Sequence, residues 1–258
     1  MSGTVLYERN GHVATITYNR PEAMNAVNGE LRADLNAAWE RLRVDDEAWV
    51  AIVTGAGRAF CAGADLKDPG SSVGNDDHSF WEVPSFTSLE SGKEIWKPVI
   101  AAVNGYALGF GLTLVSACDL VICSDRAQFG FPEVQLGVPT VQGAVRMPKM
   151  VGWQPAMELL LLGDRIDAQR AKEIGLVMQV VPHDTLLDEA NKLAERIINN
   201  CAPLAVRATK EIARRGQEMG FAEAIRFGET MRKVAAQTED AKAFRNSSKN
   251  ERPQWQGR

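Results

Sequence analysis

Short apolar segments rich in β-branched residues alternate with helix-like segments through the first half of the chain, and this alternation limits the fold most. Each apolar segment has only three to seven residues, which is the length of a strand rather than of a helix. Strands that alternate with helices are typical of a layered α/β domain. We therefore predict an α/β fold, with strands at residues 12–18, 49–54, 98–103, 120–123 and 127–129.

Apolar residues at spacings of three and four predict an amphipathic helix over residues 29–43, which Asn28 would cap. A shorter helix of small and apolar residues is predicted over residues 109–117. From residue 144 onward the pattern is mostly helical. The elements predicted there are one strand and three helices, at residues 176–181, 185–199, 203 onward and 221–237. This helical tail has too little mass for a core of its own, so we expect it to pack on the first part or on another subunit.

The composition is that of a globular protein. The 258 residues are 45% hydrophobic and 24% charged, which is enough for a substantial core, and the net charge of −4 argues against non-specific nucleic-acid binding. Four cysteines form no C-x-x-C pair, which indicates free thiols in a reducing compartment and no zinc site. The sequence shows no targeting pattern and no apolar stretch that could span a bilayer. We expect a cytoplasmic protein without nucleic-acid, membrane or metal partners.

Two glycine-rich loops, at residues 57–66 and 104–111, follow predicted strands and carry the first functional signal. Small residues let a backbone approach a ligand closely, and glycine permits positive φ angles. If the second loop opens a helix at Gly109, the free N–H groups at the helix start favour a negatively charged oxygen. Either loop alone is also compatible with a plain tight turn. The two loops together with the motifs below indicate a ligand site.

Motifs in a fixed order, covering nearly the whole chain, resemble those of the crotonase (enoyl-CoA hydratase/isomerase) family. The matching segments are RPEAMNA at 20–26, FCAGADL at 60–66, NGYALGFG at 104–111, FGFPE at 129–133, GDRIDA at 163–168, AKEIGLV at 171–177 and PQWQGR at 253–258. The resemblance implies a crotonase-like spiral of repeated ββα units at residues 1–200, with an oxyanion hole and an acyl-CoA pocket. It also implies a C-terminal helical region at residues 201–258 for packing and for assembly into a homotrimer or a hexamer of two trimers.

The chemistry that the resemblance implies is stabilisation of an enolate on an acyl-CoA thioester. In the family two backbone N–H groups bind the enolate oxygen, and the matching positions here are Ala64 and Phe110. Preorganised donors of this kind typically contribute about 3–4 kcal/mol each to lowering the barrier. The family more often has a small residue at the position of Phe110, whose ring must be accommodated beside the pocket. Coenzyme A is part of the substrate, and no separate cofactor is expected.

Acid–base residues decide which reaction follows. Hydratases of the family use two glutamates, and Glu133 in the FGFPE motif resembles one of them, whereas Thr113 occupies the position of the other. A single carboxylate suffices for a 1,3-proton shift, because it can take a proton from one carbon and return it to another. We therefore narrowly favour double-bond isomerisation of an enoyl-CoA over its hydration. An apolar pocket of Phe131, Leu136 and Val138 would raise the pKa of Glu133.

The resemblance also assigns residues to the substrate and its CoA portion. By motif position these are Ala23, Met24, Ala26, Ala62, Asp65, Leu66, Lys67, Gly109, Pro132 and Val138. Arg20 and Lys67 are candidate partners of the CoA phosphates, and Lys249 is a weaker candidate. After Glu133 the family commonly has Gly-x-x-Pro, whereas this chain has the shorter Gly137-Val138-Pro139, which predicts an altered pocket wall.

A second acid could replace the one lost at Thr113. The candidates lie in a variable region that often lines the acyl pocket in the family, and they are Asp76, Asp77, Glu82 and Glu90. Trp81 and Phe86 from the same region are candidate pocket walls. We expect Asp65 to tie down its own turn and Cys61 to be a packed thiol rather than a nucleophile.

Two other functions are compatible with the sequence. One is a CoA-thioester hydrolase or a carbon–carbon bond lyase in the degradation of aromatic or alicyclic acids, because the family includes such enzymes. The other is a non-catalytic CoA-binding protein with a degenerate site. Residues 68–77, which are rich in Gly, Ser and Asp, are expected to form a mobile surface loop.

Overall fold

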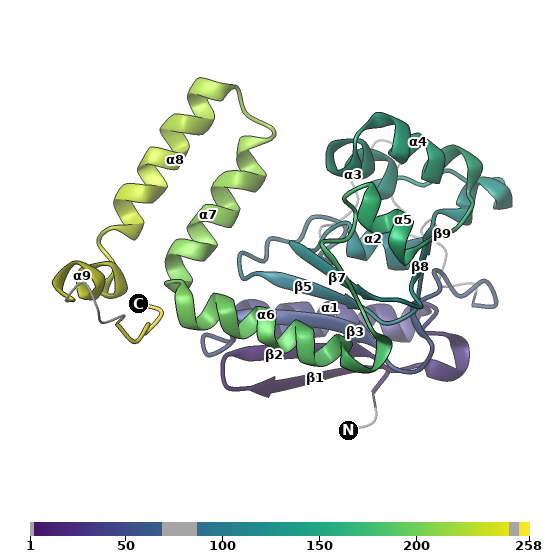
Figure 1. Cartoon of the computed structure of the whole chain (residues 1–258), viewed down its shortest axis with the longest axis horizontal. Coiled ribbons are helices and arrows are strands. Elements are labelled where there is room, and N and C mark those ends of the chain that lie inside the picture. The colour runs from purple at the N-terminus through teal and green to yellow at the C-terminus, as the bar shows by residue number, and fades with distance from the viewer. Residues whose placement is uncertain (1–2, 69–86, 248–252) are drawn as a thin grey trace.

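The structure, a computed structural model, describes residues 3–68, 87–247 and 253–258 (Figure 1). Among these residues the larger sheet has six strands, in the order β1-β2-β3-β5-β7-β10. Strand β1 is antiparallel to β2, and all the other neighbours are parallel. The strands are Val5–Asn10 (β1), Val13–Tyr18 (β2), Val50–Gly55 (β3), Val99–Val103 (β5), Leu120–Ser124 (β7) and Gln179–Val181 (β10).

A smaller sheet of four described strands has the order β4-β6-β8-β9. Its strands are Ala59–Cys61 (β4), Tyr106–Leu108 (β6), Gln128–Gly130 (β8) and Ile166–Asp167 (β9). Strands β4, β6 and β8 each follow a strand of the larger sheet after a few residues, and helical segments follow β6 and β8. This succession is the predicted ββα unit. Its repetition winds the chain into the predicted spiral, so the fold class is confirmed.

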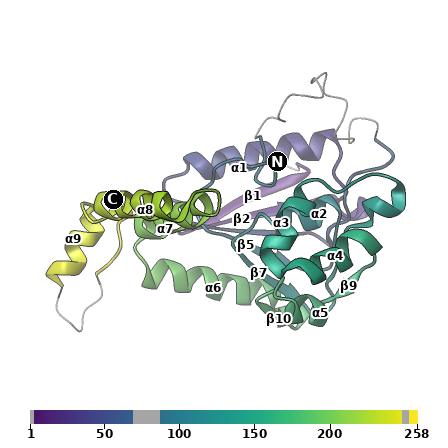
Figure 2. The same cartoon turned by 90° about the horizontal axis from the view of Figure 1, so that it is seen from above.

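Two long helices cover opposite faces of the larger sheet, α1 (Gly29–Val44) on one side and α6 (Leu186–Asn200) on the other (Figure 2). Side chains of a strand alternate between the two faces. In β3, Val53 belongs to the core under α1, whereas Ile52 belongs to the core under α6. Asn28 caps α1 with its side chain, as predicted. The sheet is therefore buried on both faces, which gives the loops at its strand ends a rigid base.

The remaining helices fall into two groups at opposite ends of the sheets (Figure 1). They are α2 (Phe110–Val115), α3 (Gln142–Val151), α4 (Trp153–Leu162), α5 (Ala168–Glu173), α7 (Pro203–Gly216), α8 (Phe221–Ala235) and α9 (Glu239–Asn246). Helices α2 to α5 gather at one end, whereas α7, α8 and α9 project from the other end as an arm. Helix α8 packs along α7 but buries no residue fully. In the part of the chain that the structure describes, no helix has the length and apolar character to cross a membrane.

Several elements differ from the sequence-based expectation. Strands β4 and β6 lie within the segments predicted as glycine-rich loops at residues 57–66 and 104–111. Strand β1 is not among the predicted strands, because residues 8–10 are polar and exposed at the sheet edge and interrupt an apolar pattern. Helix α2 is shorter than predicted and ends at Val115. Strand β10 has three residues instead of six, because Leu176 and Val177 both donate hydrogen bonds to the Ala171 carbonyl, at 2.9 and 3.2 Å, and so close the end of α5.

Candidate active site

The first glycine-rich loop presents the backbone N–H of Ala64. Beside it the N–H of Val27 donates to the Gly63 carbonyl at 2.8 Å, and the Val27 carbonyl accepts from the Asp65 N–H at 2.9 Å. This parallel bridge uses groups on either side of Ala64, so the N–H of Ala64 points to the opposite side. Gly63 has a φ of +104°, a backbone conformation that favours glycine. Ala64 itself is exposed, so a ligand can reach its N–H.

The second loop is shaped by Gly109. Its N–H donates to the Gly130 carbonyl at 2.9 Å, and its φ of +52° with ψ of −116° is a combination that other residues adopt only with strain. Gly109 directly precedes α2, so Phe110 has the first N–H of the helix, which no carbonyl of the same helix can reach. Within residues 3–68, 87–247 and 253–258, the N–H groups of Ala64 and Phe110 have no hydrogen-bond acceptor.

The two loops and Glu133 meet at one point. A Cβ atom added to Gly109 would lie 3.8 Å from the Gly63 Cα and 3.3 Å from Glu133 Oε1. The carboxyl group is therefore next to the backbone that carries the Ala64 and Phe110 N–H groups. Three segments that are far apart in the sequence thus bring two hydrogen-bond donors and one acid together. An acyl thioester bound to the two donors would have its reacting carbons beside this acid.

Glu133 lies on the short 3-10 helix η3 (Pro132–Leu136), directly after β8. Burial raises the pKa of Glu133. Oε2 of Glu133 and Oγ1 of Thr140 are both buried and have no hydrogen-bond partner among the described residues. Buried polar atoms normally have partners. These two atoms therefore mark a place where a water molecule or a polar ligand atom fits.

The apolar wall predicted around Glu133 is only partly present. Phe131 is fully buried, and its ring packs against Gly143 at the start of α3. Leu136 and Val138, in contrast, are 59% and 52% exposed. Helix η3 ends at Gly137, whose φ of +81° turns the chain so that the two side chains face outward. The expectation that Leu136 and Val138 enclose the carboxyl is corrected accordingly, and a contact of Val138 with substrate stays a prediction.

Helix α2 carries the two residues, Thr113 and Phe110, at which the sequence differs from the usual family pattern. Thr113, at the position of the family glutamate that Glu133 does not match, is buried and has no ionisable group. The ring of Phe110 lies beneath the guanidinium of Arg32, which is 5.2 Å from the ring centroid. This cation–π contact holds the ring against α1. The large side chain of Phe110 is therefore accommodated without the loss of its backbone donor.

Asn25 fastens the first loop, a role that the sequence motifs did not reveal. Its Nδ2 donates to the carbonyls of Ala56 and Ala59 at 2.9 and 2.7 Å, and its Oδ1 accepts from the Arg20 N–H at 2.8 Å. Asn25 is fully buried with a φ of +56°. Asparagine tolerates this left-handed conformation better than most residues. The asparagine inside the RPEAMNA motif was the available signal for this role.

Several residues predicted at the CoA portion surround the same loop. The Met24 carbonyl accepts from the Ala62 N–H at 3.1 Å, and the Ala26 carbonyl accepts from Arg20 Nη1 at 2.6 Å. Arg20 also forms an ion pair with Asp65 at 3.2 Å. The guanidinium of Arg20 thus already ties the two segments together. Its predicted contact with a CoA phosphate would have to be made in addition to these bonds.

The other predicted CoA contacts lie around the exposed rim. Ala23 ends the 3-10 helix η1 (Pro21–Ala23), and Leu66 and Lys67 are exposed. The Lys67 N–H donates to Asp65 Oδ1 at 3.2 Å, in keeping with the expected role of Asp65 in its own turn. The roles of Ala23, Leu66 and Lys67 in CoA binding, like that of Pro132 at the start of η3, stay predictions.

The remaining candidates differ in what the structure says of them. Cys61 is fully buried, and burial raises the pKa of its thiol to about 12, so it is a packed thiol and not a thiolate nucleophile. Glu90 is buried as well, and burial raises its pKa. The residues that lie outside the described part of the chain are Asp76, Asp77, Trp81, Glu82, Phe86 and Lys249, together with most of the predicted loop at residues 68–77. Among the described residues no group of three or more His, Cys, Asp or Glu side chains could hold a metal ion.

A spiral of ββα units in which two glycine loops meet a glutamate defines a protein of the crotonase class. A family model described as enoyl-CoA hydratase/isomerase matches residues 8–258. The chain belongs to the enoyl-CoA hydratase/isomerase family. It is an enzyme of that family that acts on CoA thioesters, as the motifs predicted.

Individual relatives match over nearly their whole length. The chain is 38% identical to (E)-benzylidenesuccinyl-CoA hydratase of Thauera aromatica, over 98% of this chain and 99% of that protein. It is 39% identical to carnitinyl-CoA dehydratase of Citrobacter koseri, over 88% of this chain and 86% of that protein. The crystal structure of an enoyl-CoA hydratase from Mycobacterium tuberculosis superposes with a TM-score of 0.89 at 36% identity, and the match covers 99% of this chain and 100% of that one.

Proposed function

We propose that the enzyme catalyses the reversible addition of water to the double bond of a 2-enoyl-CoA thioester, with Glu133 as its acid–base residue. The observation that carries this proposal is the convergence of the Ala64 and Phe110 N–H groups with the Glu133 carboxyl. The names of the relatives, a hydratase and a dehydratase, favour the addition and removal of water. They outweigh the narrow preference for isomerisation that the single glutamate suggested.

In the proposed mechanism the thioester carbonyl accepts hydrogen bonds from the Ala64 and Phe110 N–H groups. This polarises the conjugated system and makes C3 electrophilic. Ionised Glu133 takes one proton from a water molecule as the water oxygen bonds to C3, and the electron pair of the double bond moves toward the carbonyl to give an enolate. Protonated Glu133 then delivers that proton to C2, and the carbonyl re-forms. The water molecule ends as a hydroxyl on C3 and a hydrogen on C2, so one carboxyl suffices.

The environment of Glu133 supports both halves of this cycle. Burial raises the pKa of Glu133, which makes the ionised carboxylate a stronger base toward water and lets the protonated form hold the proton until it is delivered to C2. The partnerless Oε2 and the Thr140 hydroxyl beside it offer hydrogen bonds to the attacking water. Each of the two amide donors is expected to lower the barrier by about 3–4 kcal/mol, because it is already in place when negative charge develops.

Isomerisation of a 3-enoyl-CoA to a 2-enoyl-CoA is the second candidate, and Thr113 is the observation that favours it. With no second carboxyl at that position, the residue that removes a proton from C2 must also supply one to C4. Glu133 could do both through a dienolate bound by the same two N–H groups. Hydration and isomerisation therefore use the same donors and differ in whether a water molecule takes part.

The proposal also includes an oligomeric state, a compartment and the role of coenzyme A. We expect a homotrimer or a hexamer of two trimers in the cytoplasm, with coenzyme A as part of the substrate and no separate cofactor. The exposed apolar residues of the arm, such as Phe221 and Ile225, support assembly with further copies.

The two reactions can be distinguished by incubating the enzyme with trans-2-hexenoyl-CoA and, separately, with trans-3-hexenoyl-CoA. Loss of the absorbance of the conjugated thioester from the first substrate indicates hydration. A gain of that absorbance from the second indicates isomerisation. If neither substrate changes, both reactions are contradicted for this chain length.

The role of Glu133 can be tested with Glu133→Gln. We expect kcat to fall by about 10²- to 10⁴-fold, the usual contribution of a positioned acid–base group. In the unchanged enzyme kcat/KM is expected to decline as the pH falls through the raised pKa of Glu133, because only the ionised form accepts the proton of water. Glu22→Gln, on the exposed part of η1, is the matched control. Full activity in Glu133→Gln would contradict the assignment.

A further inference from the structure

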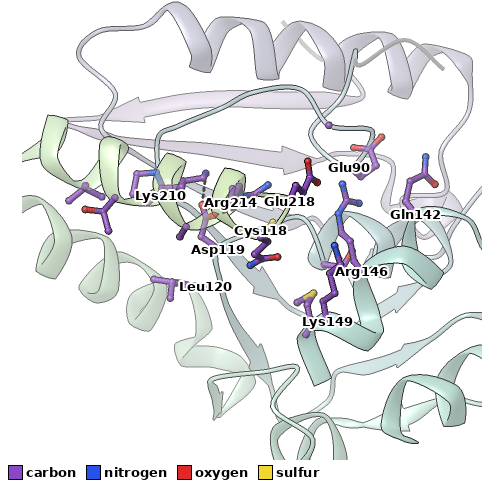
Figure 3. A pocket seen from close by; sticks show the side chains of 18 of the residues that line it. Glu90, Cys118, Asp119, Leu120, Gln142, Arg146, Lys149, Lys210, Arg214 and Glu218 are labelled. Atoms are coloured by element: carbon purple, nitrogen blue, oxygen red, sulfur yellow. Dashed lines mark hydrogen bonds and ion pairs between the residues drawn. The ribbon is translucent and has the colours of Figure 1, made fainter. Parts of the chain in front are cut away.

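A cleft with a volume of about 1150 Å³ lies between the body and α7 (Figure 3). Part of its wall follows α2 and includes Ser116, and another part is formed by α3 and includes Arg146. Helix α3 packs against α2. In its first turn, Gly143 contacts the ring of Phe131, and Phe131 is two residues before Glu133 in the sequence. We call the end of the cleft at Ser116 and Arg146 its inner end. Helices α2 and α3 therefore border both this inner end and the candidate active site.

The distance along α2 suits an acyl group. Phe110, which carries one proposed donor, begins the helix, and Ser116 follows its last residue. Six residues of α-helix extend about 9 Å. An extended six-carbon acyl group reaches about 6 Å from its carbonyl carbon. The side chain of Arg146 extends from α3 into the cleft (Figure 3).

Two ionisable side chains at this inner end have buried atoms without hydrogen-bond partners among the described residues. Glu90 is almost fully buried, and its Oε1 accepts from the Ser88 hydroxyl, whereas its Oε2 has no hydrogen-bond partner among the described residues. Nη1 of Arg146 is also buried and lacks a partner within the same residues. Figure 3 shows the guanidinium of Arg146 extended toward the Glu90 carboxyl, and no ion pair joins the two. A small polar group between them would satisfy both atoms.

The charge of the cleft indicates the sign of that group. Lys210 and Arg214 pair with the two oxygens of the same carboxylate, that of Asp119, at 2.6 and 3.1 Å, so these three side chains together keep one net positive charge. Arg146 and Lys149 line the cleft and form no ion pair in the described part of the chain. Burial raises the pKa of Glu90, which favours its neutral, proton-donating form, whereas an arginine keeps its charge. The inner end is thus a cationic site with an additional hydrogen-bond donor.

We propose that Arg146 and the carboxylic acid of Glu90 bind a carboxylate at the far end of the acyl group, so that the substrates are CoA half-thioesters of dicarboxylic acids. This inference rests on the proposed function and adds the class of acyl group. The substrate carboxylate accepts from Arg146 Nη1 and from the proton of Glu90, so both partnerless atoms are used and the guanidinium charge is neutralised. An acyl group that ends in a methyl would leave both buried groups unpaired.

Binding of two saturated thioesters, adipyl-CoA and hexanoyl-CoA, tests the inference without turnover. They have the same number of acyl carbons and differ in the terminal carboxylate. Isothermal titration calorimetry on the full chain is expected to give an affinity for adipyl-CoA about tenfold or more above that for hexanoyl-CoA. Arg146→Met should remove this preference. Hexanoyl-CoA should bind to the variant at least as well as to the unchanged protein, because no buried guanidinium is then left unpaired, and this binding also shows that the variant is folded. Lys149→Met, an exposed position on the same helix, should keep the preference within about twofold.

Equal affinities for the two thioesters in the unchanged protein would overturn the inference, and so would a preference that survives Arg146→Met. Glu90→Gln retains a hydrogen-bond donor of similar shape, so we expect it to keep most of the preference, whereas Glu90→Leu should reduce it. Because no reaction is needed, this result is independent of the hydration assay. An enzyme that binds adipyl-CoA preferentially but hydrates neither trans-2-hexenoyl-CoA nor its terminal-carboxylate analogue would contradict the proposed function and leave the carboxylate site standing.

Discussion

The partial burial of the Glu133 carboxyl affects stability as well as chemistry. Burial penalises the ionised form and so raises the pKa above its ordinary value of 4.5. Between the pKa of the unfolded chain and the raised pKa of the folded chain, the folded state keeps a proton that the unfolded state has released. The free energy of unfolding therefore decreases as the pH rises through this window. Above the window, the ionised carboxylate destabilises the folded enzyme.

We accordingly expect Glu133→Gln to increase the free energy of unfolding at pH 8, by about 1 kcal/mol or less because the group is partly solvated. At pH 4 the carboxyl is mostly protonated in both states, and the variant should have nearly the stability of the unchanged protein. Urea unfolding at the two pH values measures the difference, with Glu22→Gln as the exposed control. A lower stability of Glu133→Gln at pH 8 would contradict the burial argument.

At the scale of an element, Gly109 determines how α2 presents its first N–H. An alanine there would be strained at a φ of +52° and would place its Cβ 3.3 Å from Glu133 Oε1. We expect Gly109→Ala to lower stability by about 1–2 kcal/mol and kcat/KM by about 100-fold. Gly152→Ala, between α3 and α4, is the control, because its φ is +81° but a Cβ there meets nothing within 4 Å. It should show the loss of stability without the loss of activity, and equal activity of the two variants would show that the loop conformation is unimportant.

The connection between the 20–26 segment and the first glycine loop depends on Asn25. Its buried side chain makes three hydrogen bonds, and its φ is +56°. Asn25→Ala and Asn25→Gly both remove these bonds and leave backbone groups unsatisfied, so each should lower the free energy of unfolding by about 2–4 kcal/mol. The glycine variant should be the more stable of the two by about 1 kcal/mol, since only glycine adopts this φ without strain. Chemical denaturation compares them, and the reverse order would contradict the strain argument.

Much of the fold could be predicted from the sequence because it depends on local patterns. Apolar periodicity together with the cap at Asn28 was sufficient to predict α1, and short apolar segments were sufficient to predict β2, β3 and β5. Strand β1 could not be predicted in the same way, since its polar edge residues are paired only through the neighbouring strand. The three-residue length of β10 depends on how α5 ends, which apolar content does not reveal.

For the candidate site as well, the sequence predicts some features and not others. Motif position selected Ala64, Phe110 and Glu133, and the structure brings their loops together. Their catalytic roles remain predictions until the variants are measured. The outward direction of Leu136 depends on the left-handed turn at Gly137, and composition does not specify it. Arg146 of α3 extends toward Glu90, which belongs to a segment far away in the sequence, and no local pattern encodes such a long-range approach.

At the scale of the whole molecule, the arm exposes apolar side chains that the chain itself does not cover. Phe221 is 84% exposed, and Ile225 and Val234 of the same helix are 53% and 64% exposed. Such residues are typical of an interface between subunits. We expect sedimentation to show a trimer or a hexamer and Phe221→Asp to shift the distribution toward the monomer, whereas Lys233→Asp on the same helix should not. An unchanged assembly in Phe221→Asp would exclude this end of α8 from the interface.

The arm also has a consequence for the order in which the protein acquires structure. Helix α8 has no fully buried residue, and α7 has only Pro203, whereas β3 and β5 lie between α1 and α6. A helical hairpin with so little burial is marginally stable in water unless another surface covers it. The amide hydrogens of α8 should therefore exchange with solvent at a rate that depends on protein concentration, and those of β3 should not. We therefore expect the folding of the arm to be coupled to the proposed association of subunits, so that dilution unfolds the arm first.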